Sequence, residues 1–134
     1  MIETAAEPET EQAGEAFART LKPGDVVLLY GELGAGKTAF VRGMARGLGA
    51  NTDDVSSPTF TIIQEYAGTT ATLHHVDLYR LAPAEIDDLG LEDLLESGAI
   101  VAIEWAERWP GRPRGATTVT IEHLGGDARR VRIG

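Results

Sequence analysis

This chain contains a glycine-rich segment, Gly31-Glu-Leu-Gly-Ala-Gly-Lys-Thr38, whose spacing limits the folds open to it. Its spacing is a glycine, four residues, then glycine, lysine and a hydroxyl residue, which is the pattern of a phosphate-binding loop. The apolar run 25–30 before it predicts a buried strand, and residues 38–48 after it place apolar side chains at helical spacing. Strand, glycine loop and helix in this order are the context that such a loop requires.

Glycines let a backbone turn tightly and approach an anion, and the helix N-terminus adds partial positive charge. In such a loop Lys37 reaches the β- and γ-phosphates, and the Thr38 hydroxyl binds Mg²⁺. Guanine-specific proteins of this kind carry Asn-Lys-x-Asp, whereas Asn51 is the chain's only asparagine and has no lysine near it, so we expect ATP. The expected nucleotide contacts in this segment are Gly31, Glu32, Leu33, Gly34, Ala35, Gly36, Lys37, Thr38 and Ala39.

The rest of the chain alternates between predicted helices and strands. Thr10 is expected to be the N-cap of a helix that runs to about Leu21. Further elements follow from apolar periodicity and turn residues: an antiparallel hairpin over 60–66 and 71–78, two short helices within 83–96, and strands at 100–103, 117–124 and 129–133. This order predicts an α/β, P-loop NTPase-like three-layer sandwich with a mixed, largely parallel sheet, in a single domain over residues 1–134.

Two carboxylates follow predicted strands and are candidates for the chemistry. Open α/β sheets bind ligands at the carboxyl ends of their strands, where Asp77 and Glu104 are expected to lie. Asp77 alone could instead be a turn or capping residue. Glu104 follows four apolar residues, and a buried carboxylate needs a cation or hydrogen bonds. We therefore expect Thr38, Asp77 and Glu104 to bind Mg²⁺ and Lys37, Asp77 and Glu104 to be catalytic, with the roles of the two acids left open.

Other polar residues allow two interpretations each. Thr59 lies in the turn-rich segment 56–60, which is either a simple turn or a switch that closes over the γ-phosphate. His74 and His75 have no second cluster at metal-ligand spacing, so we expect solvated or core histidines. A loop with three arginines supplies either an arginine finger or solvated charge: Arg108, Arg112 and Arg114.

Composition and charge exclude several classes of protein. The formal net charge of −9 argues against a chain that grips nucleic acid alone, because affinity for phosphate backbones comes from clustered Lys and Arg. The absence of cysteine excludes disulfides and thiolate metal sites. No apolar run is long enough for a membrane span, and residues 1–10 are acidic, unlike a secretory signal. We expect a cytoplasmic protein without membrane contact.

Four ordered motifs carry a resemblance to a known family. They are Gly31–Thr38, Ser57-Pro-Thr-Phe60, His75-Val-Asp-Leu-Tyr-Arg-Leu81 and Ile103-Glu-Trp105, and together they span most of the chain. In these motifs the chain resembles the TsaE family, formerly called YjeE. The one departure within the loop region is Ala39, where many relatives carry a second threonine.

The resemblance implies a Mg²⁺-dependent ATPase that supports threonylcarbamoyladenosine modification of tRNA. It implies TsaB and TsaD as partners, tRNA contact only through that complex, and slow hydrolysis by the protein alone. Thr10 is implied as a nucleotide contact and Thr59 as part of the switch. Two rival interpretations stay open from the residues themselves: a small-molecule kinase, and a nucleotide-gated binding module without hydrolysis.

Overall fold

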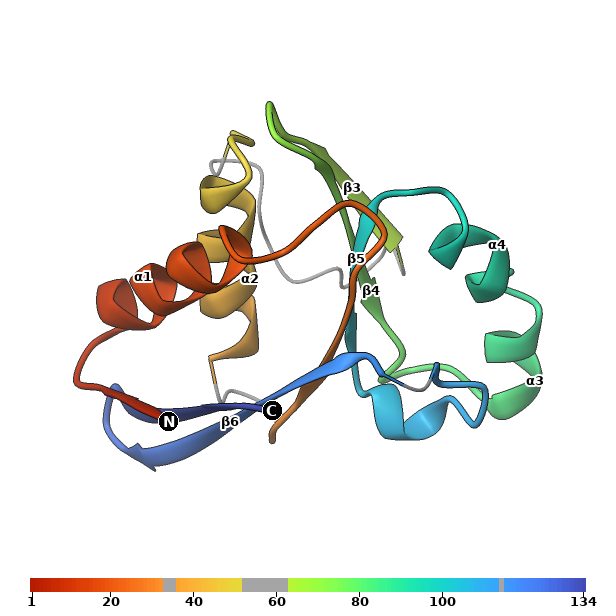
Figure 1. Cartoon of the computed structure of the whole chain (residues 1–134). Helices are drawn as coiled ribbons and strands as arrows, with labels where there is room; N and C mark the ends of the chain where they lie inside the picture. Colours follow the sequence, from red (N-terminus) through yellow and green to blue (C-terminus); the bar gives the residue numbers. More distant parts are fainter. Residues whose placement is uncertain (33–35, 52–62, 114) are drawn as a thin grey trace.

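The computed structural model describes residues 1–32, 36–51, 63–113 and 115–134. These residues form one seven-stranded sheet with helices on both faces (Figure 1). The elements in chain order are β1 (Ile2–Thr4), α1 (Glu7–Ala18), β2 (Val26–Tyr30), α2 (Lys37–Gly47), β3 (Ile63–Ala67), β4 (Thr72–Asp77), α3 (Pro83–Asp87), α4 (Leu91–Leu95), β5 (Ile100–Glu104), the 3₁₀ turn η2 (Ala106–Arg108), β6 (Thr117–Gly125) and β7 (Ala128–Ile133).

The sheet is mixed, with a parallel centre and antiparallel margins. Its strand order is β1-β7-β6-β2-β5-β4-β3. The pairs β6–β2, β2–β5 and β5–β4 are parallel, and the pairs β1–β7, β7–β6 and β4–β3 are antiparallel. The carboxyl ends of β2, β5 and β4 therefore meet at one edge of the sheet, which is where α/β folds place their ligands.

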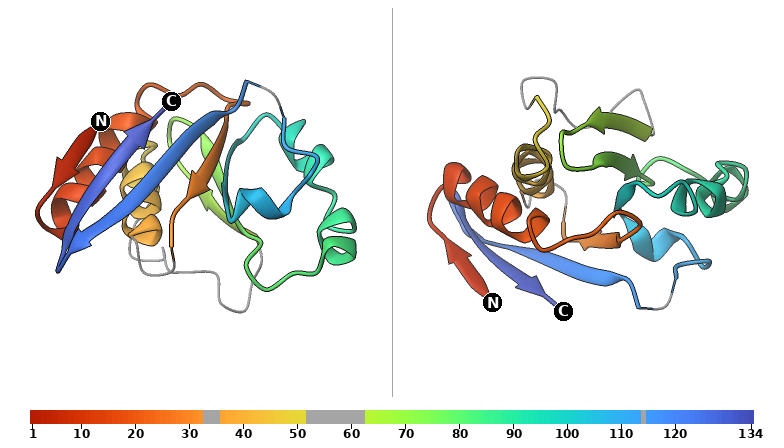
Figure 2. Two further views of the ribbon diagram at one scale, coloured as in Figure 1. Left: turned by 90° about the horizontal axis from the view of Figure 1, so that it is seen from below. Right: turned by 45° about the horizontal axis from the view of Figure 1, so that its top comes forward.

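Apolar side chains on the two faces of the sheet make two separate cores. One core joins α1 and α2 to the sheet through residues such as Phe17, Phe40 and Met44. The other lies under α3, α4 and η2 and contains Leu91 and Trp109. Figure 2 shows the sheet between these two helical layers, which agrees with the predicted three-layer α/β class. All five residues of β5 are buried, as expected for a central strand covered on both faces.

Helices α1 and α2 approach each other closely because glycines lie at their contact. A Cβ added to Gly43 would lie 1.8 Å from the backbone oxygen of Glu11, and one added to Gly14 would lie 2.1 Å from that of Phe40. Only a residue without a side chain fits where two backbones meet in this way. The backbones of α1 and α2 therefore pack directly against each other at these glycines.

The predicted start of the first helix was wrong. The helix begins at Glu7, with Ala6 as its N-cap, and Thr10 lies inside it. The Glu9 side chain explains the difference, because its Oε2 accepts hydrogen bonds from the backbone N–H groups of Ala5 (2.5 Å) and Ala6 (3.1 Å). This carboxylate caps the helix in place of the Thr10 hydroxyl.

The other predicted elements agree with the structure where it describes them. The antiparallel hairpin is β3–β4, the two short helices are α3 and α4, and the last two strands are β6 and β7. The strand β1 was missed. In the described part of the chain, no helix has the length and apolar character to cross a membrane.

Candidate functional site

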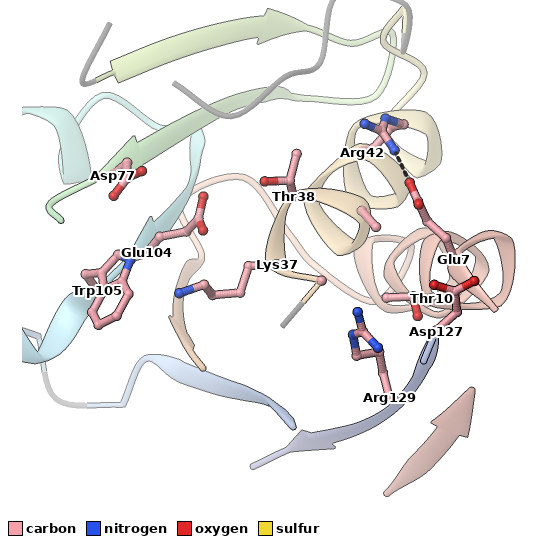
Figure 3. Close-up of a pocket in the computed structure, with 12 residues that line it drawn as sticks. Glu7, Thr10, Lys37, Thr38, Arg42, Asp77, Glu104, Trp105, Asp127 and Arg129 are labelled. Atoms are coloured by element: carbon pink, nitrogen blue, oxygen red, sulfur yellow. Dashed lines mark hydrogen bonds and ion pairs between the residues drawn. The ribbon is translucent and has the colours of Figure 1, made fainter. Parts of the chain in front are cut away.

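A cavity of about 350 Å³ lies at the carboxyl ends of the central strands, beside the start of α2 (Figure 3). It lies on the sheet face that α1 and α2 cover. Volumes of this order are typical of small-molecule sites. Its walls come from α1, the start of α2, the ends of β4 and β5, the β6–β7 turn and β7: Glu7, Thr10, Gly36, Lys37, Thr38, Ala39, Arg42, Asp77, Glu104, Trp105, Asp127 and Arg129.

The first residue of α2, Lys37, extends into this cavity. Gly36 precedes it as the N-cap with φ of 100°, a left-handed conformation that glycine adopts without strain. Lys37 is only 5% exposed. Its Nζ donates a hydrogen bond of 2.6 Å to the backbone oxygen of Gly31. Burial lowers the pKa of Lys37, although the nearby carboxylates of Glu104 and Asp77 oppose this. The lysine is thus a desolvated cation that a bound anion would stabilise.

Trp105 covers the same ammonium group. Nζ of Lys37 lies 4.1 Å from the centroid of the indole ring, within the range of a cation–π contact. The Tyr79 ring packs beside the indole, with 4.9 Å between the ring centroids. Trp105 has φ of 58°, which among the described residues is the only positive value outside glycine. Positive φ values outside glycine are concentrated at functional sites, and this one belongs to the residue whose indole covers Lys37.

The two predicted acids lie side by side on neighbouring strands. Asp77, the last residue of β4, is the register partner of Glu104, the last residue of β5. Oδ1 of Asp77 accepts a hydrogen bond of 2.9 Å from the backbone N–H of Tyr79. Burial raises the pKa of Asp77, the Tyr79 bond lowers it, and the charge of Glu104 adds to the rise. A divalent cation between the acids would relieve this repulsion.

Glu104 is also hydrogen-bonded to a buried histidine. It is 4% exposed, and its Oε2 is hydrogen-bonded to Nε2 of His75, whose residue is 0% exposed. His75 is therefore a core histidine, one of the two outcomes expected for it. The neighbouring histidine, His74, faces the opposite side of β4, where its Nε2 lies 3.8 Å from Oε2 of Glu65.

The remaining predicted contacts fall into three groups. Thr38, Ala39 and Thr10 line the cavity with Lys37, so the structure brings them together. The Thr10 hydroxyl is hydrogen-bonded to that of Thr4 at 2.8 Å, and residue 10 is 1% exposed. Two predicted loop contacts, Gly31 and Glu32, are described by the structure but do not line the cavity. Several predicted contacts lie outside the described residues: Leu33, Gly34, Ala35, Thr59 and the proposed switch 56–60.

Five cavity residues were not predicted as site residues: Trp105, which lies in one of the motifs, and four others that lie in none. Asp127 comes from the β6–β7 turn and Arg129 from β7, and Glu7 and Arg42 come from α1 and α2. A Cβ on Gly36 would lie 3.3 Å from Nε of Arg129, so this arginine packs against the start of α2. Arg42 donates hydrogen bonds to Glu7 and Glu11 at 3.0 and 2.7 Å. These residues carry no motif, and only the strand order brings the last hairpin to the site.

Arginines of the loop after β5 contact the loop's own backbone and a neighbouring ring. Arg112 donates two hydrogen bonds of 3.0 Å to the backbone oxygens of Ala106 and Trp109. Arg108 lies over the Tyr79 ring, with 5.9 Å from its Cζ to the ring centroid. Neither residue lines the cavity, which favours a loop of solvated charge over an arginine finger. Arg114 lies outside the described residues.

The residues at the cavity fit a metal ion only in part. In the described ranges there is no group of three or more His, Cys, Asp or Glu side chains that could hold a metal by themselves. Asp77, Glu104 and Thr38 nevertheless place oxygen-bearing side chains around one space. Mg²⁺ is usually bound in this way, by one or two carboxylates together with substrate phosphates and water. The donor set therefore fits Mg²⁺ that arrives with a phosphorylated ligand.

The parallel central strands, with a buried lysine at the start of the following helix, define an α/β protein of the P-loop NTPase-like class. The family model for Threonylcarbamoyl adenosine biosynthesis protein TsaE matches residues 4–131. The chain belongs to the TsaE family, which is a family of nucleotide-binding proteins.

Curated relatives and a solved structure agree with this membership. The TsaE protein of Nostoc sp. is 41% identical over 133 residues, which covers 96% of this chain and 82% of the relative. That of Bacillus subtilis is 41% identical and covers 92% and 77%, and that of Treponema pallidum is 38% identical and covers 93% of each. The crystal structure of Bacillus subtilis YdiB superposes with a TM-score of 0.75 at 34% identity, covering 97% of this chain and 80% of that chain.

Proposed function

We propose that this protein binds and hydrolyses ATP with Mg²⁺ and thereby supports threonylcarbamoyladenosine modification of tRNA. The pathway follows from the names of its relatives, which are tRNA threonylcarbamoyladenosine biosynthesis proteins. The observation that carries the chemistry is the convergence of Lys37, Thr38, Asp77 and Glu104 on one cavity. We place the activity in a single ATPase domain over residues 1–134, in the cytoplasm.

Lys37 is the residue on which phosphate binding depends in this proposal. Its Nζ is bound to the Gly31 oxygen and covered by Trp105, so it is already aligned within the cavity. A buried ammonium group gains more from an anion than an exposed one, because the surrounding dielectric is low. Lys37 would turn from the Gly31 oxygen to the β- and γ-phosphates, while backbone N–H groups of residues 31–39 bind their oxygens.

Thr38, Asp77 and Glu104 would surround Mg²⁺, with Thr38 and one of the two acids bound to it directly, and the ion would neutralise charge on the phosphates. The acid that does not bind the ion directly would orient the attacking water and accept its proton. Either acid can fill either role. The raised pKa of Asp77 favours it as the proton acceptor, because a carboxylate with a higher pKa is a stronger base.

We further propose that TsaB and TsaD are the partners and that tRNA is contacted only through them. The formal net charge of −9 supports indirect contact. Thr10 at the cavity wall would contact the nucleotide, and Thr59 with the segment 56–60 would report the γ-phosphate to the partner. Family membership does not favour a small-molecule kinase or a module without hydrolysis.

The test is ATP binding and single-turnover hydrolysis by the purified protein. Isothermal titration calorimetry with Mg²⁺ and ATP should show binding that Lys37→Ala weakens by at least about 100-fold, the scale of losing a buried charge contact. Hydrolysis should be slow alone and faster with TsaB and TsaD. Equal affinity of parent and Lys37→Ala would refute the proposed site. Binding without turnover in the presence of both partners would refute the ATPase, and phosphate transfer to a metabolite would support a kinase instead.

A further inference from the structure

His75 is a fully buried side chain with a single polar contact of known geometry. Its Nε2 is hydrogen-bonded to Oε2 of Glu104 on the neighbouring strand. A carboxylate oxygen is a hydrogen-bond acceptor, so Nε2 is assigned as the donor in this bond. Within the part of the chain that the structure describes, Nδ1 of His75 has no hydrogen-bond partner. The bond to Glu104 is therefore what compensates the burial of this polar ring.

The strand register explains how the two side chains meet. His75 is the partner of Ala102, and Asp77, two residues further along β4, is the partner of Glu104. Residues two apart on a strand lie on the same face, so all four face α2. The small Ala102 leaves room beside the imidazole, which contacts the glutamate diagonally. Diagonal neighbours of this kind are within reach of long side chains.

His75 contacts Glu104 from the protein interior, away from the cavity. Glu104 lines the cavity, whereas His75 does not. Figure 3 shows the Glu104 carboxylate pointing into the space between Asp77 and Thr38. Because Oε2 is engaged by His75, the carboxylate cannot rotate freely, and Oε1 is the oxygen left without this bond.

We propose that His75 is a positioning residue, which fixes the Glu104 carboxylate so that Oε1 is presented to the metal ion accompanying the nucleotide. The inference rests on the proposed function, since it needs a metal–nucleotide complex at this cavity. Hydrogen bonds to metal-binding carboxylates orient the ligand, and their loss commonly reduces metal affinity by about 10- to 100-fold. His75 itself touches neither the metal nor the nucleotide in this arrangement.

The experiment compares ATP affinity with Mg²⁺ and with EDTA, measured by calorimetry on four proteins. They are the parent, His75→Leu, His75→Gln and the control His74→Leu on the opposite face of β4. We expect His75→Leu to weaken binding about tenfold in Mg²⁺ and to leave binding in EDTA unchanged. His75→Gln should keep most of the Mg²⁺ effect, because the glutamine amide can donate from nearly the position of Nε2. His74→Leu should match the parent.

Unchanged Mg²⁺ dependence in His75→Leu, or equal losses in His75→Leu and His75→Gln, would overturn the inference while the proposed function stands. A loss of the same size in EDTA would also overturn it, because that pattern indicates general damage to the site. If the parent binds no ATP in Mg²⁺, the proposed function fails and this inference fails with it. Should His75→Leu not fold by circular dichroism, His75→Asn replaces it, since its shorter amide cannot reach Glu104.

Discussion

The two faces of the sheet are covered in different ways. On one face α1 and α2 have 12 and 11 residues, and their backbones meet at glycines. On the other face α3 and α4 have five residues each and cover the sheet with single apolar anchors such as Ile86 and Leu91. The candidate site belongs to the first face. A helix whose backbone position is fixed can hold Lys37 and Thr38 in place, whereas the second face needs only to exclude water.

The contact between α1 and α2 is closest at Gly43. We expect Gly43→Ala to cost more than the roughly 1–3 kcal/mol usual for overpacking, because the new Cβ would lie 1.8 Å from the Glu11 backbone oxygen. Gly47→Ala is the matched control in the same helix, where the nearest atom would be 2.6 Å away. Thermal unfolding should rank Gly43→Ala as the less stable. Equal stability of the two variants would show that the helix contact does not depend on backbone proximity.

A substitution on the opposite face should destabilise the protein without weakening ligand binding at the cavity. Leu91→Ala removes a side chain that is 1% exposed and should cost about 2–4 kcal/mol in unfolding free energy. Below its unfolding temperature the variant should bind ATP and Mg²⁺ like the parent, because α4 supplies no residue to the cavity. Chemical denaturation and calorimetry measure the two effects. A tenfold loss of ATP affinity in the folded variant would contradict the separation of the faces.

The two faces also differ in the ion pairs between their helices. Glu11 on α1 contacts Arg42 at 2.7 Å and Arg46 at 3.2 Å on α2, whereas none of the ion pairs found among the described residues joins α3 to α4. Glu11→Gln should therefore destabilise the protein by about 1 kcal/mol, and less in high salt, since these partly exposed pairs are screened. Glu92→Gln on α4 is the control and should have no measurable effect. The measurement is urea unfolding at low and high ionic strength.

The smallest expected effect is a gain in stability at the site itself. Burial raises the pKa of Asp77 in the folded protein, so the folded state favours the protonated form. The carboxylate then costs stability above its ordinary value of 3.8, and this cost disappears as the pH falls below it. Asp77→Asn should raise the melting temperature at pH 7, by an amount that shrinks toward pH 4. Asp87→Asn on α3 controls for the loss of a surface charge, and a lower melting temperature at pH 7 would contradict the argument.

The sequence predicted the parts of the fold that local patterns encode. The apolar run 100–103 and the glycine spacing before Lys37 depend on near neighbours, so the buried β5 and the start of α2 followed from them. Three-residue β1 was missed because it is defined by pairing with β7 at the other end of the chain. The helix start at Glu7 was missed because the Glu9 side chain caps the helix in place of a hydroxyl at residue 10.

The site was only partly predictable for a related reason. Asp77 and Glu104 could be named because each ends an apolar strand. Their adjacency, and the contact between His75 and Glu104, depend on the register of β4 against β5, which no local pattern specifies. Arg129 reaches the cavity only because the last hairpin lies next to β2 in the strand order. The site contacts that could not be predicted therefore depend on strand pairing between segments far apart in the chain.

The position of Trp105 has a practical consequence. Its indole lies 4.1 Å from Nζ of Lys37, and the other tryptophan, Trp109, is 2% exposed in the core beneath α3 and α4. Departure of the ammonium group toward a phosphate would change the surroundings of one indole and leave the other as a constant background. The intrinsic fluorescence of the unlabelled protein is thereby an optical reporter of whether its lysine is engaged.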